Sequence, residues 1–200
     1  MSHDIRTPLN AILGMTYIAK NNLDNPDYAK ECLDKSSAAS QQLLTLINDI
    51  LDISKIESGK LFLTYQTTSI SSVFDNLTEI IKPLALNKKI TFTHNLHNID
   101  YNYVSTDKSR LEQICLNLLS NAVKHGKINL DISEKKLNDE EVLLIIIVED
   151  NGIGMSEEFQ KTMYQSFTRE INTQVNKTQG TGLGLYIIKL IVDAMGGKIS

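Results

Sequence analysis

Residues 107–125 read DKSRLEQICLNLLSNAVKH and contain the clearest helical pattern in the chain. Its apolar residues recur every three or four positions, which is typical of an amphipathic helix that buries one face. That face consists of Leu111, Ile114, Leu118 and Leu119. A strand-like segment follows at 128–132 and, after a polar hairpin, a wholly apolar one at 142–148. A helix followed by two strands indicates an α/β layer rather than a helical bundle.

The sequence on either side extends this α/β pattern. Upstream, strand-like alternation at Leu61, Leu63 and Tyr65 precedes a helical pattern at 73–86 and a second alternation at 90–96. Downstream, two glycine-bearing loops and a final helix complete the pattern, at 150–154, 180–184 and 185–195. We therefore expect an α/β sandwich over 61–200. Because 196–200 reads as the opening of another strand, we expect the sandwich to continue beyond it.

Residues 1–58 follow a helical period instead. The first seam has spacings of three and four residues and consists of Ile5, Leu9, Ile12, Thr16, Ala19 and Leu23. The second consists of Leu33, Ser36, Ser40, Leu43, Ile47, Ile50 and Ser54. A polar turn separates the two patterns, and Gly59 offers a C-terminal stop. The sequence thus predicts an antiparallel helical hairpin over 1–58.

The two predicted helices carry more apolar residues than one hairpin covers. Off the predicted seams lie Met15, Leu44, Leu46 and Leu51. A second copy that packs against them would complete a four-helix bundle. We therefore expect a homodimer through residues 1–58.

Composition excludes several classes of protein. The 200 residues are 42% hydrophobic and 22% charged, with a net charge of −4 from interspersed residues of both signs, so no basic stripe suggests nucleic acid. Cys32 and Cys115 lie in separate helical patterns and predict no disulfide framework, which fits a cytoplasmic location. The apolar run 142–148 is far shorter than the roughly 20 residues of a membrane span. We expect no membrane insertion of this segment, which leaves open a membrane-anchored parent protein.

Five short motifs occur in order along the chain. They are SHDIRTPL at 2–9, NLLSNA at 117–122, DNGIG at 150–154, FTR at 167–169 and GTGLGL at 180–185. Each is weak alone, but their order and spacing resemble the phosphoacceptor, N, first glycine, F and second glycine boxes of sensor histidine kinases. The resemblance implies an α+β chain, with a dimeric phosphoacceptor hairpin joined to an ATP-binding sandwich of the gyrase, Hsp90 and histidine kinase type. Whether the parent is a hybrid kinase stays open.

His3 falls on the solvent side of the first helix in the predicted register. A neutral imidazole can attack the γ-phosphate of ATP and form a phosphoramidate. Thr7, one turn later, shares the face of His3. The resemblance assigns Asp4 the role of general base and Thr7 the positioning of water for dephosphorylation. The alternative is that Thr7 caps a helix beginning at Pro8 and that His3 lies in a frayed end.

Asn117 and Asn121 stand four residues apart and share a helix face. Magnesium prefers hard oxygen ligands and takes few of them from protein when phosphates are present. The resemblance makes Asn121 the Mg²⁺ ligand and Asn117 a residue that supports it. It also implies that Lys124 contacts phosphate and that His125 borders the nucleotide. Alternatively, the two asparagines simply face solvent on an amphipathic helix.

The two glycine boxes suit a flat, phosphorylated ligand. Asp150 ends a strand, and Gly152 and Gly154 let the backbone approach a ligand closely. The resemblance assigns Asp150 to the adenine amino group, although a strand-ending Asp-Asn-Gly is also a common turn. The second box precedes a helix, whose backbone N–H groups can hold phosphates. Its residues are Gly180, Thr181, Gly182, Leu183 and Gly184.

The polar stretch from Phe167 to Gly180 reads as a lid over the nucleotide. Arg169 can neutralise charge on the γ-phosphate, or it is an ordinary surface residue. The sequence contains neither the Gly-Lys-Ser or Gly-Lys-Thr of a P-loop nor the motifs of serine, threonine and tyrosine kinases.

These features predict an ATP-dependent protein-histidine kinase of a two-component system, which phosphorylates His3 and then a response-regulator receiver domain. Two alternatives stay open: an ATPase of the same superfamily, and a nucleotide-binding dimeric scaffold without catalysis. An ATPase would carry a water-activating carboxylate where this chain has Asn117. We also expect the sequence to be a fragment, because the helix that would support His3 begins only two residues before it.

Overall fold

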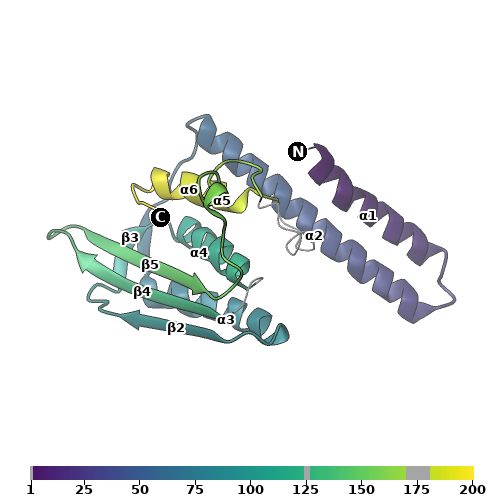
Figure 1. Ribbon diagram of the computed structural model, residues 1–200, viewed down its shortest axis with the longest axis horizontal. Helices are drawn as coiled ribbons and strands as arrows, with labels where there is room; N and C mark the ends of the chain where they lie inside the picture. The colour runs from purple at the N-terminus through teal and green to yellow at the C-terminus, as the bar shows by residue number, and fades with distance from the viewer. Residues whose placement is uncertain (1, 124–126, 170–180) are drawn as a thin grey trace. The chain divides into compact units, whose positions relative to one another are not determined.

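A computed structural model describes residues 2–123, 127–169 and 181–200 (Figure 1). The chain forms two compact units: the first contains residues up to Leu61 together with 181–183 of the second glycine box, and the second contains the other described residues from Phe62 onward. The first unit contains a helical hairpin, and the second is an α/β unit. Within the described residues no helix is both long enough and apolar enough to span a membrane.

The hairpin consists of α1 (Ser2–Lys20) and α2 (Pro26–Glu57), which lie antiparallel (Figure 1). Asn25 caps α2, because its side-chain oxygen accepts a hydrogen bond from the Tyr28 N–H at 3.2 Å. Proline at the first position of α2 suits this start, where a backbone N–H would have no helical partner. The cap fixes the point at which the turn ends and the second helix begins.

Gly59 terminates α2 as the sequence predicts. Its φ of +67° is left-handed, a conformation that glycine adopts without steric cost. The Gly59 N–H donates to the Ile56 carbonyl at 2.9 Å and the Lys60 N–H to the Lys55 carbonyl at 2.8 Å. These two bonds satisfy carbonyls that the last helical turn leaves open. The chain therefore leaves the hairpin from a well-defined helix end.

Small side chains form the contact between α1 and α2. Ala19, Ala29 and Cys32 make a buried cluster, against which Met15 and Ile18 pack. Farther along the hairpin, the Thr16 and Ser36 hydroxyls share a hydrogen bond of 3.2 Å. Small residues at these positions allow the two helix backbones to approach closely.

The predicted seam of α2 is wrong at several positions. Leu33 and Ile47 are 53% and 41% exposed, whereas the neighbouring Cys32 and Leu46 are each 2% exposed. The buried stripe runs through 32, 36, 39, 43, 46 and 50, and a parallel stripe one residue later has the same spacing. Spacing alone cannot separate two adjacent stripes. On α1, likewise, Leu9 is 43% exposed, although it was expected in the seam.

Two small sheets form the β layer of the second unit. The larger contains β2 (Phe92–His97), β4 (Ile128–Lys136) and β5 (Val142–Asp150), with β4 in the middle. β4 pairs in parallel with β2 and antiparallel with β5. In the smaller sheet, β1 (Gln66–Ser69) pairs antiparallel with β3 (Tyr103–Thr106).

The strand predictions were less accurate than the helix predictions. The strand expected at Leu61–Tyr65 is irregular, and β1 begins at Gln66 instead. No sequence pattern predicted β3, a short strand with few apolar residues. No strand forms at 196–200 in the described residues. The apolar run of β5 is only half-buried, because Leu144, Ile146 and Val148 face the core while Leu143 and Ile147 are 43% and 46% exposed.

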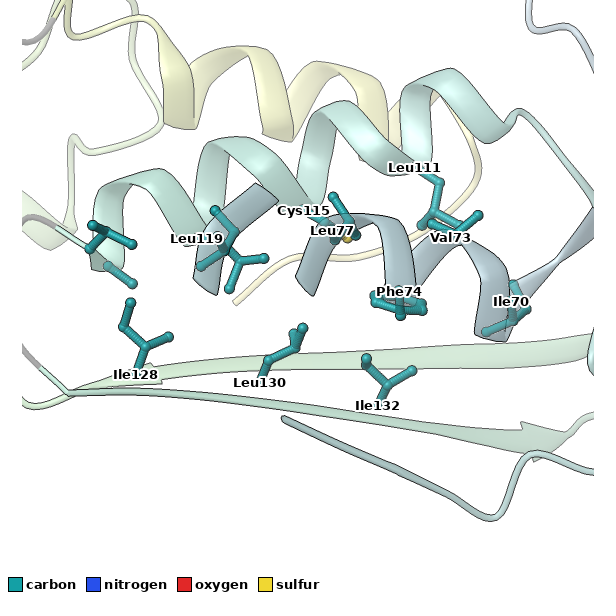
Figure 2. Close-up of a cluster of buried hydrophobic side chains, with 13 residues drawn as sticks. Ile70, Val73, Phe74, Leu77, Leu111, Cys115, Leu119, Ile128, Leu130 and Ile132 are labelled. Atoms are coloured by element: carbon teal, nitrogen blue, oxygen red, sulfur yellow. The ribbon is translucent and has the colours of Figure 1, made fainter. Parts of the chain in front are cut away.

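Helices cover one face of the larger sheet. The helices of this unit are α3 (Ile70–Asn87), α4 (Lys108–Ala122), the short α5 (Glu157–Gln160) and α6 (Gly184–Ala194). Figure 2 shows Ile128, Leu130 and Ile132 of β4 pointing toward α3 and α4. These strand residues are fully buried, as are Phe74, Leu77 and Leu119 on the helices. Burial of each such side chain stabilises the unit by roughly 1.5–3 kcal/mol.

Candidate active site

His3 lies in the first turn of α1 and is exposed to solvent. The Thr7 hydroxyl donates to the His3 carbonyl at 3.1 Å, so Thr7 bonds back along the helix. The helix starts at Ser2 and continues through Pro8, which has no N–H for the carbonyl four residues earlier. The alternative in which Pro8 is the first helical residue and Thr7 its cap is therefore wrong. Asp4 is half-buried beside His3 in the sequence.

Asn117 and Asn121 are both half-buried on α4. The core face of this helix, formed by Leu111, Cys115 and Leu119, fixes the rotation of α4 and so the direction of the two carboxamides. A Cβ added to Gly184 would lie 3.9 Å from Asn121 Nδ2. The first backbone N–H groups of a helix have no hydrogen-bond acceptor within that helix. The start of α6, which exposes such groups, thus lies next to Asn121, the predicted magnesium ligand.

The described residues contain no group of three or more histidine, cysteine, aspartate or glutamate side chains that could hold a metal ion. A hard cation at Asn121 would therefore need oxygen ligands from elsewhere, which triphosphate and water supply. A carboxamide beside a helix N-terminus, which attracts phosphate, fits such a shared site. The residues present are thus compatible with Mg²⁺ bound together with a nucleotide.

The first glycine box forms a tight turn after β5. The Gly152 N–H donates to Asp150 Oδ1 at 2.8 Å, and Asp150 is exposed. Asn151 fixes the loop, because its Oδ1 accepts from the Lys127 N–H at 2.5 Å and its own N–H donates to the Lys127 carbonyl at 3.2 Å. Gly154 has a φ of +71°, which favours glycine. The turn leaves Asp150 Oδ2 without a hydrogen bond within the described residues.

The second glycine box contains a local hydrogen bond and one left-handed residue. The Leu183 N–H donates to Thr181 Oγ1 at 3.2 Å, and Gly182 has a φ of +71°. The box leads directly into α6. It has the geometry of a loop that turns sharply before a helix N-terminus.

In the F box, Phe167 adopts a φ of +62°, which is unusual for a residue with a side chain. Left-handed backbone costs such a residue about 1–2 kcal/mol. The Phe167 side chain is 42% exposed. Arg169 is also exposed.

Several predicted site residues lie outside the described part of the chain. They are Lys124, His125 and Gly180. Most of the predicted lid, 170–180, is outside it as well. The roles assigned to these residues stay predictions.

A groove of about 540 Å³ lies between α3 and α4. It is lined by Asn76, Leu77, Glu79, Ile80, Glu112 and Leu116. It contains none of the residues predicted to hold a nucleotide. The candidate site is instead marked by Asn121, the start of α6 and the turn after β5.

Asp107 and Asn151 were not singled out from the sequence. Asp107 is 4% exposed and caps α4 by accepting a hydrogen bond from the Arg110 N–H at 3.1 Å. An aspartate directly before a helical pattern is a recognised N-cap signal that could have identified it. The hydrogen bonds between Asn151 and Lys127 join residues that are 24 positions apart, so no local sequence pattern predicts them.

Two protein families match separate parts of this chain. The family described as "His Kinase A (phospho-acceptor) domain" matches residues 1–59, the part that carries His3. The family described as "Histidine kinase-, DNA gyrase B-, and HSP90-like ATPase" matches residues 106–200, the part that carries α4 and both glycine boxes.

Among solved structures, full-length ShkA in complex with AMPPNP is 26% identical, with a TM-score of 0.69, and the match covers 98% of this chain and 40% of ShkA. The histidine kinase ThkA in complex with the response regulator TrrA is 20% identical, with a TM-score of 0.62, covering 98% of this chain and 53% of that one. The second likeness shows the fold alone.

The whole chain also aligns with curated sensor kinases. The autoinducer 2 sensor kinase/phosphatase LuxQ of Vibrio vulnificus (strain CMCP6) is 36% identical over 205 aligned positions, which cover 100% of this chain and 24% of LuxQ. The chain thus spans about a quarter of the length of this relative. Because one chain joins a phosphoacceptor hairpin to an ATPase unit in the order that these kinases share, it is a histidine kinase catalytic core and belongs to the sensor histidine kinase family.

Proposed function

We propose that this chain is the core of an ATP-dependent protein-histidine kinase of a two-component system. It autophosphorylates His3 and then passes the phosphoryl group to an aspartate of a response-regulator receiver domain. The observation that carries the proposal is the exposed position of His3, in the first helical turn of the segment that matches phosphoacceptor domains. We assign the reaction to the cytoplasm, where ATP is available.

In the first step, a ring nitrogen of His3 attacks the γ-phosphorus of ATP. A P–N bond forms, the bond from phosphorus to the bridging oxygen breaks, and ADP leaves with that electron pair. The other ring nitrogen loses its proton, and we assign its acceptance to the Asp4 carboxylate. In the second step, a carboxylate oxygen of the receiver aspartate attacks phosphorus, the P–N bond breaks, and the imidazole regains a proton.

The orientation of the Thr7 hydroxyl supports a role in the reverse direction. Its proton is engaged with the His3 carbonyl, so its oxygen lone pairs remain available as acceptors. We assign Thr7 the orientation of a water molecule that hydrolyses the phosphorylated receiver. An acceptor can align such a water by taking one of its hydrogens.

The hydrogen bonds of Asp150 support its assignment to adenine. Gly152 occupies Oδ1, which leaves Oδ2 to accept from the exocyclic amino group of the base. The remaining nucleotide contacts are assigned by their place in the boxes. They are Asn117, Lys124, His125, Gly152, Gly154, Phe167, Arg169, Gly180, Thr181, Gly182, Leu183 and Gly184.

Asn121 is the residue we assign to Mg²⁺, with Asn117 in support. When bound, Mg²⁺ would neutralise charge on the phosphate oxygens. The proximity of Gly184 to the Asn121 side chain means that phosphates held at the start of α6 would lie beside this carboxamide. Asn121 would thereby help to orient the triphosphate.

A stripe of exposed apolar residues supports a homodimer through residues 1–58. On α2 the stripe consists of Leu33, Leu44, Ile47 and Leu51, each at least 41% exposed. On α1, Leu13 and Tyr17 are 62% and 70% exposed. We call these six residues the exposed stripe. A second hairpin packed on it would bury apolar surface that one copy leaves in water and complete a four-helix bundle.

The direct test is incubation of the protein with ATP labelled at the γ-phosphate. The wild type should gain acid-labile, alkali-stable label, and His3→Ala should gain none. Asn121→Ala should reduce labelling through weaker binding of Mg²⁺ and ATP while it leaves the helical content unchanged.

The outcome also separates the alternatives. Release of free phosphate without labelled protein would identify an ATPase, and nucleotide binding with neither product would identify a scaffold. Label that persists in His3→Ala would show that another residue carries the phosphoryl group.

A further inference from the structure

Asp107 makes a second contact that a helix cap does not require. Its Oδ1 accepts from the Arg110 N–H at 3.1 Å and from the Ser109 hydroxyl at 2.9 Å, which completes the N-cap of α4. Its Oδ2 accepts from the Thr64 N–H at 2.8 Å. Thr64 precedes Asp107 by 43 positions, so the two oxygens of one carboxylate join distant parts of the chain. We call the bond from Thr64 to Asp107 the tether.

The burial and charge of Asp107 indicate that the tether is a specific contact of the fold and not a chance surface contact. The carboxylate is 4% exposed, and burial alone would raise its pKa. The N–H groups of Thr64 and Arg110 and the Ser109 hydroxyl outweigh that effect, so the pKa of Asp107 lies below its usual value. A buried charge whose acceptor positions are filled in this way is stabilised in the ionised form.

The tether joins the exit of the hairpin to the helix that carries the N box. α2 ends at Glu57, and Thr64 comes five positions after Gly59, the glycine that terminates the helix. Beyond Thr64, β1 pairs with β3, with Gln66 opposite Thr106, the residue just before Asp107. The chain that leaves the hairpin is therefore bonded to the segment that runs directly into α4.

The tether shortens the free part of this connection. With it, only residues 61–63 lie between the hydrogen-bonded end of α2 at Lys60 and the anchor at Thr64. Without it, the next anchor is Gln66 in β1, so Thr64 and Tyr65 join the free segment. An extended residue spans at most about 3.5 Å, so release of these two residues adds about 7 Å of reach.

We propose that Asp107 is a positioning residue for autophosphorylation, which acts by holding the connection between hairpin and ATP-binding unit short through Thr64. This inference rests on the proposed function. Transfer requires that the γ-phosphate and His3 meet, and a longer connection spreads the two units over more arrangements. Release of the tether therefore lowers the fraction of time spent in a reactive arrangement, while the groups assigned to ATP keep their places.

Thr64→Pro breaks the tether and spares the cap, whereas Asp107→Asn leaves too few acceptors for the cap and the tether together. Thr64→Pro removes the donating N–H and leaves every bond of Asp107 to α4 in place. Asp107→Asn keeps one acceptor oxygen but turns the other into a donor, so the amide can serve the two α4 donors or Thr64, not both. Thr64→Ala is the matched control, since it retains the N–H.

A second control separates positioning from stability. Ser69 caps α3 by accepting from the Ser72 N–H at 3.3 Å, so Ser69→Ala weakens a neighbouring helix start without touching the tether. All variants are compared with the intact wild type by melting temperature, by affinity for a non-hydrolysable ATP analogue, and by the rate of His3 labelling at saturating ATP.

Thr64→Pro and Asp107→Asn should lower the labelling rate at least fivefold, with the nucleotide affinity changed less than twofold. Thr64→Ala and Ser69→Ala should keep the wild-type rate. If Thr64→Pro fails to fold, Asp107→Asn decides. Wild-type rates in folded tether variants would overturn the inference, as would an equal loss in Ser69→Ala. If the wild type labels no histidine, the proposed function fails instead, and that measurement comes first.

Discussion

The two units of this chain differ in how many of their large apolar residues they bury. The hairpin buries Leu46 and the small residues Ala19, Ala29 and Cys32, and it leaves the exposed stripe in water. The ATP-binding unit buries large residues such as Phe74 and Leu130 completely. The ATP-binding unit thus has a complete core of its own. The hairpin exposes apolar side chains that would become buried when a second copy packs against them. Mutations should therefore act on stability in one unit and on association in the other.

The largest effect is expected in the core of the ATP-binding unit. Phe74→Ala removes a 1% exposed side chain that packs between α3 and β4 and should lower the free energy of unfolding by about 3–5 kcal/mol. Chemical denaturation followed by circular dichroism should show this unit unfolding early, while the hairpin melts as in the wild type. A simultaneous early loss of both units would contradict the contrast.

An intermediate effect is expected from a charge in the exposed stripe. Leu44 is 51% exposed, so Leu44→Glu should cost the monomer little, but it should weaken dimerisation at least tenfold because a carboxylate would be buried between two copies. Sedimentation equilibrium measures this. Leu84→Glu, at a 46% exposed position of α3, is the control and should leave the association constant unchanged. Equal weakening by both variants would remove the stripe from the interface.

The smallest effect concerns Asp49 on α2. Burial and the nearby charge of Asp52 raise the pKa of the Asp49 carboxyl to about 6. An aspartate in the unfolded chain titrates near 3.9, so the folded state holds this proton more tightly and bears a cost once the group ionises. The cost is fully present above about pH 6 and disappears as the pH falls toward 4.

Asp49→Asn should therefore stabilise the hairpin by about 1–2 kcal/mol at pH 7.5 and by almost nothing at pH 4. Thermal unfolding of the helices at the two pH values measures the difference. Asp24→Asn, at an exposed position in the turn between the helices, should change neither value. A gain from Asp49→Asn that is independent of pH would show that the ionised carboxylate is not the source of the cost.

The sequence predicted features that depend on local pattern. The start of α4, the stop at Gly59 and the order of the boxes follow from helix periodicity, capping and motif spacing. The buried seam of α2 could not be predicted in this way, because two adjacent stripes share the same spacing and the buried one is rich in small residues. The tether of Thr64 to Asp107 was equally hidden, since it depends on a contact between segments 43 positions apart.

Both cysteines of the chain are buried, and this has a practical consequence. Cys32 and Cys115 are 2% and 0% exposed, and burial, with the charge of Glu112 nearby, raises the pKa of the Cys115 thiol to about 12. A thiol that stays protonated and shielded reacts slowly with maleimides and disulfide reagents. A fluorophore or spin label can therefore be attached to a single cysteine introduced at an exposed position outside the exposed stripe, such as Leu137, without first replacing the native thiols.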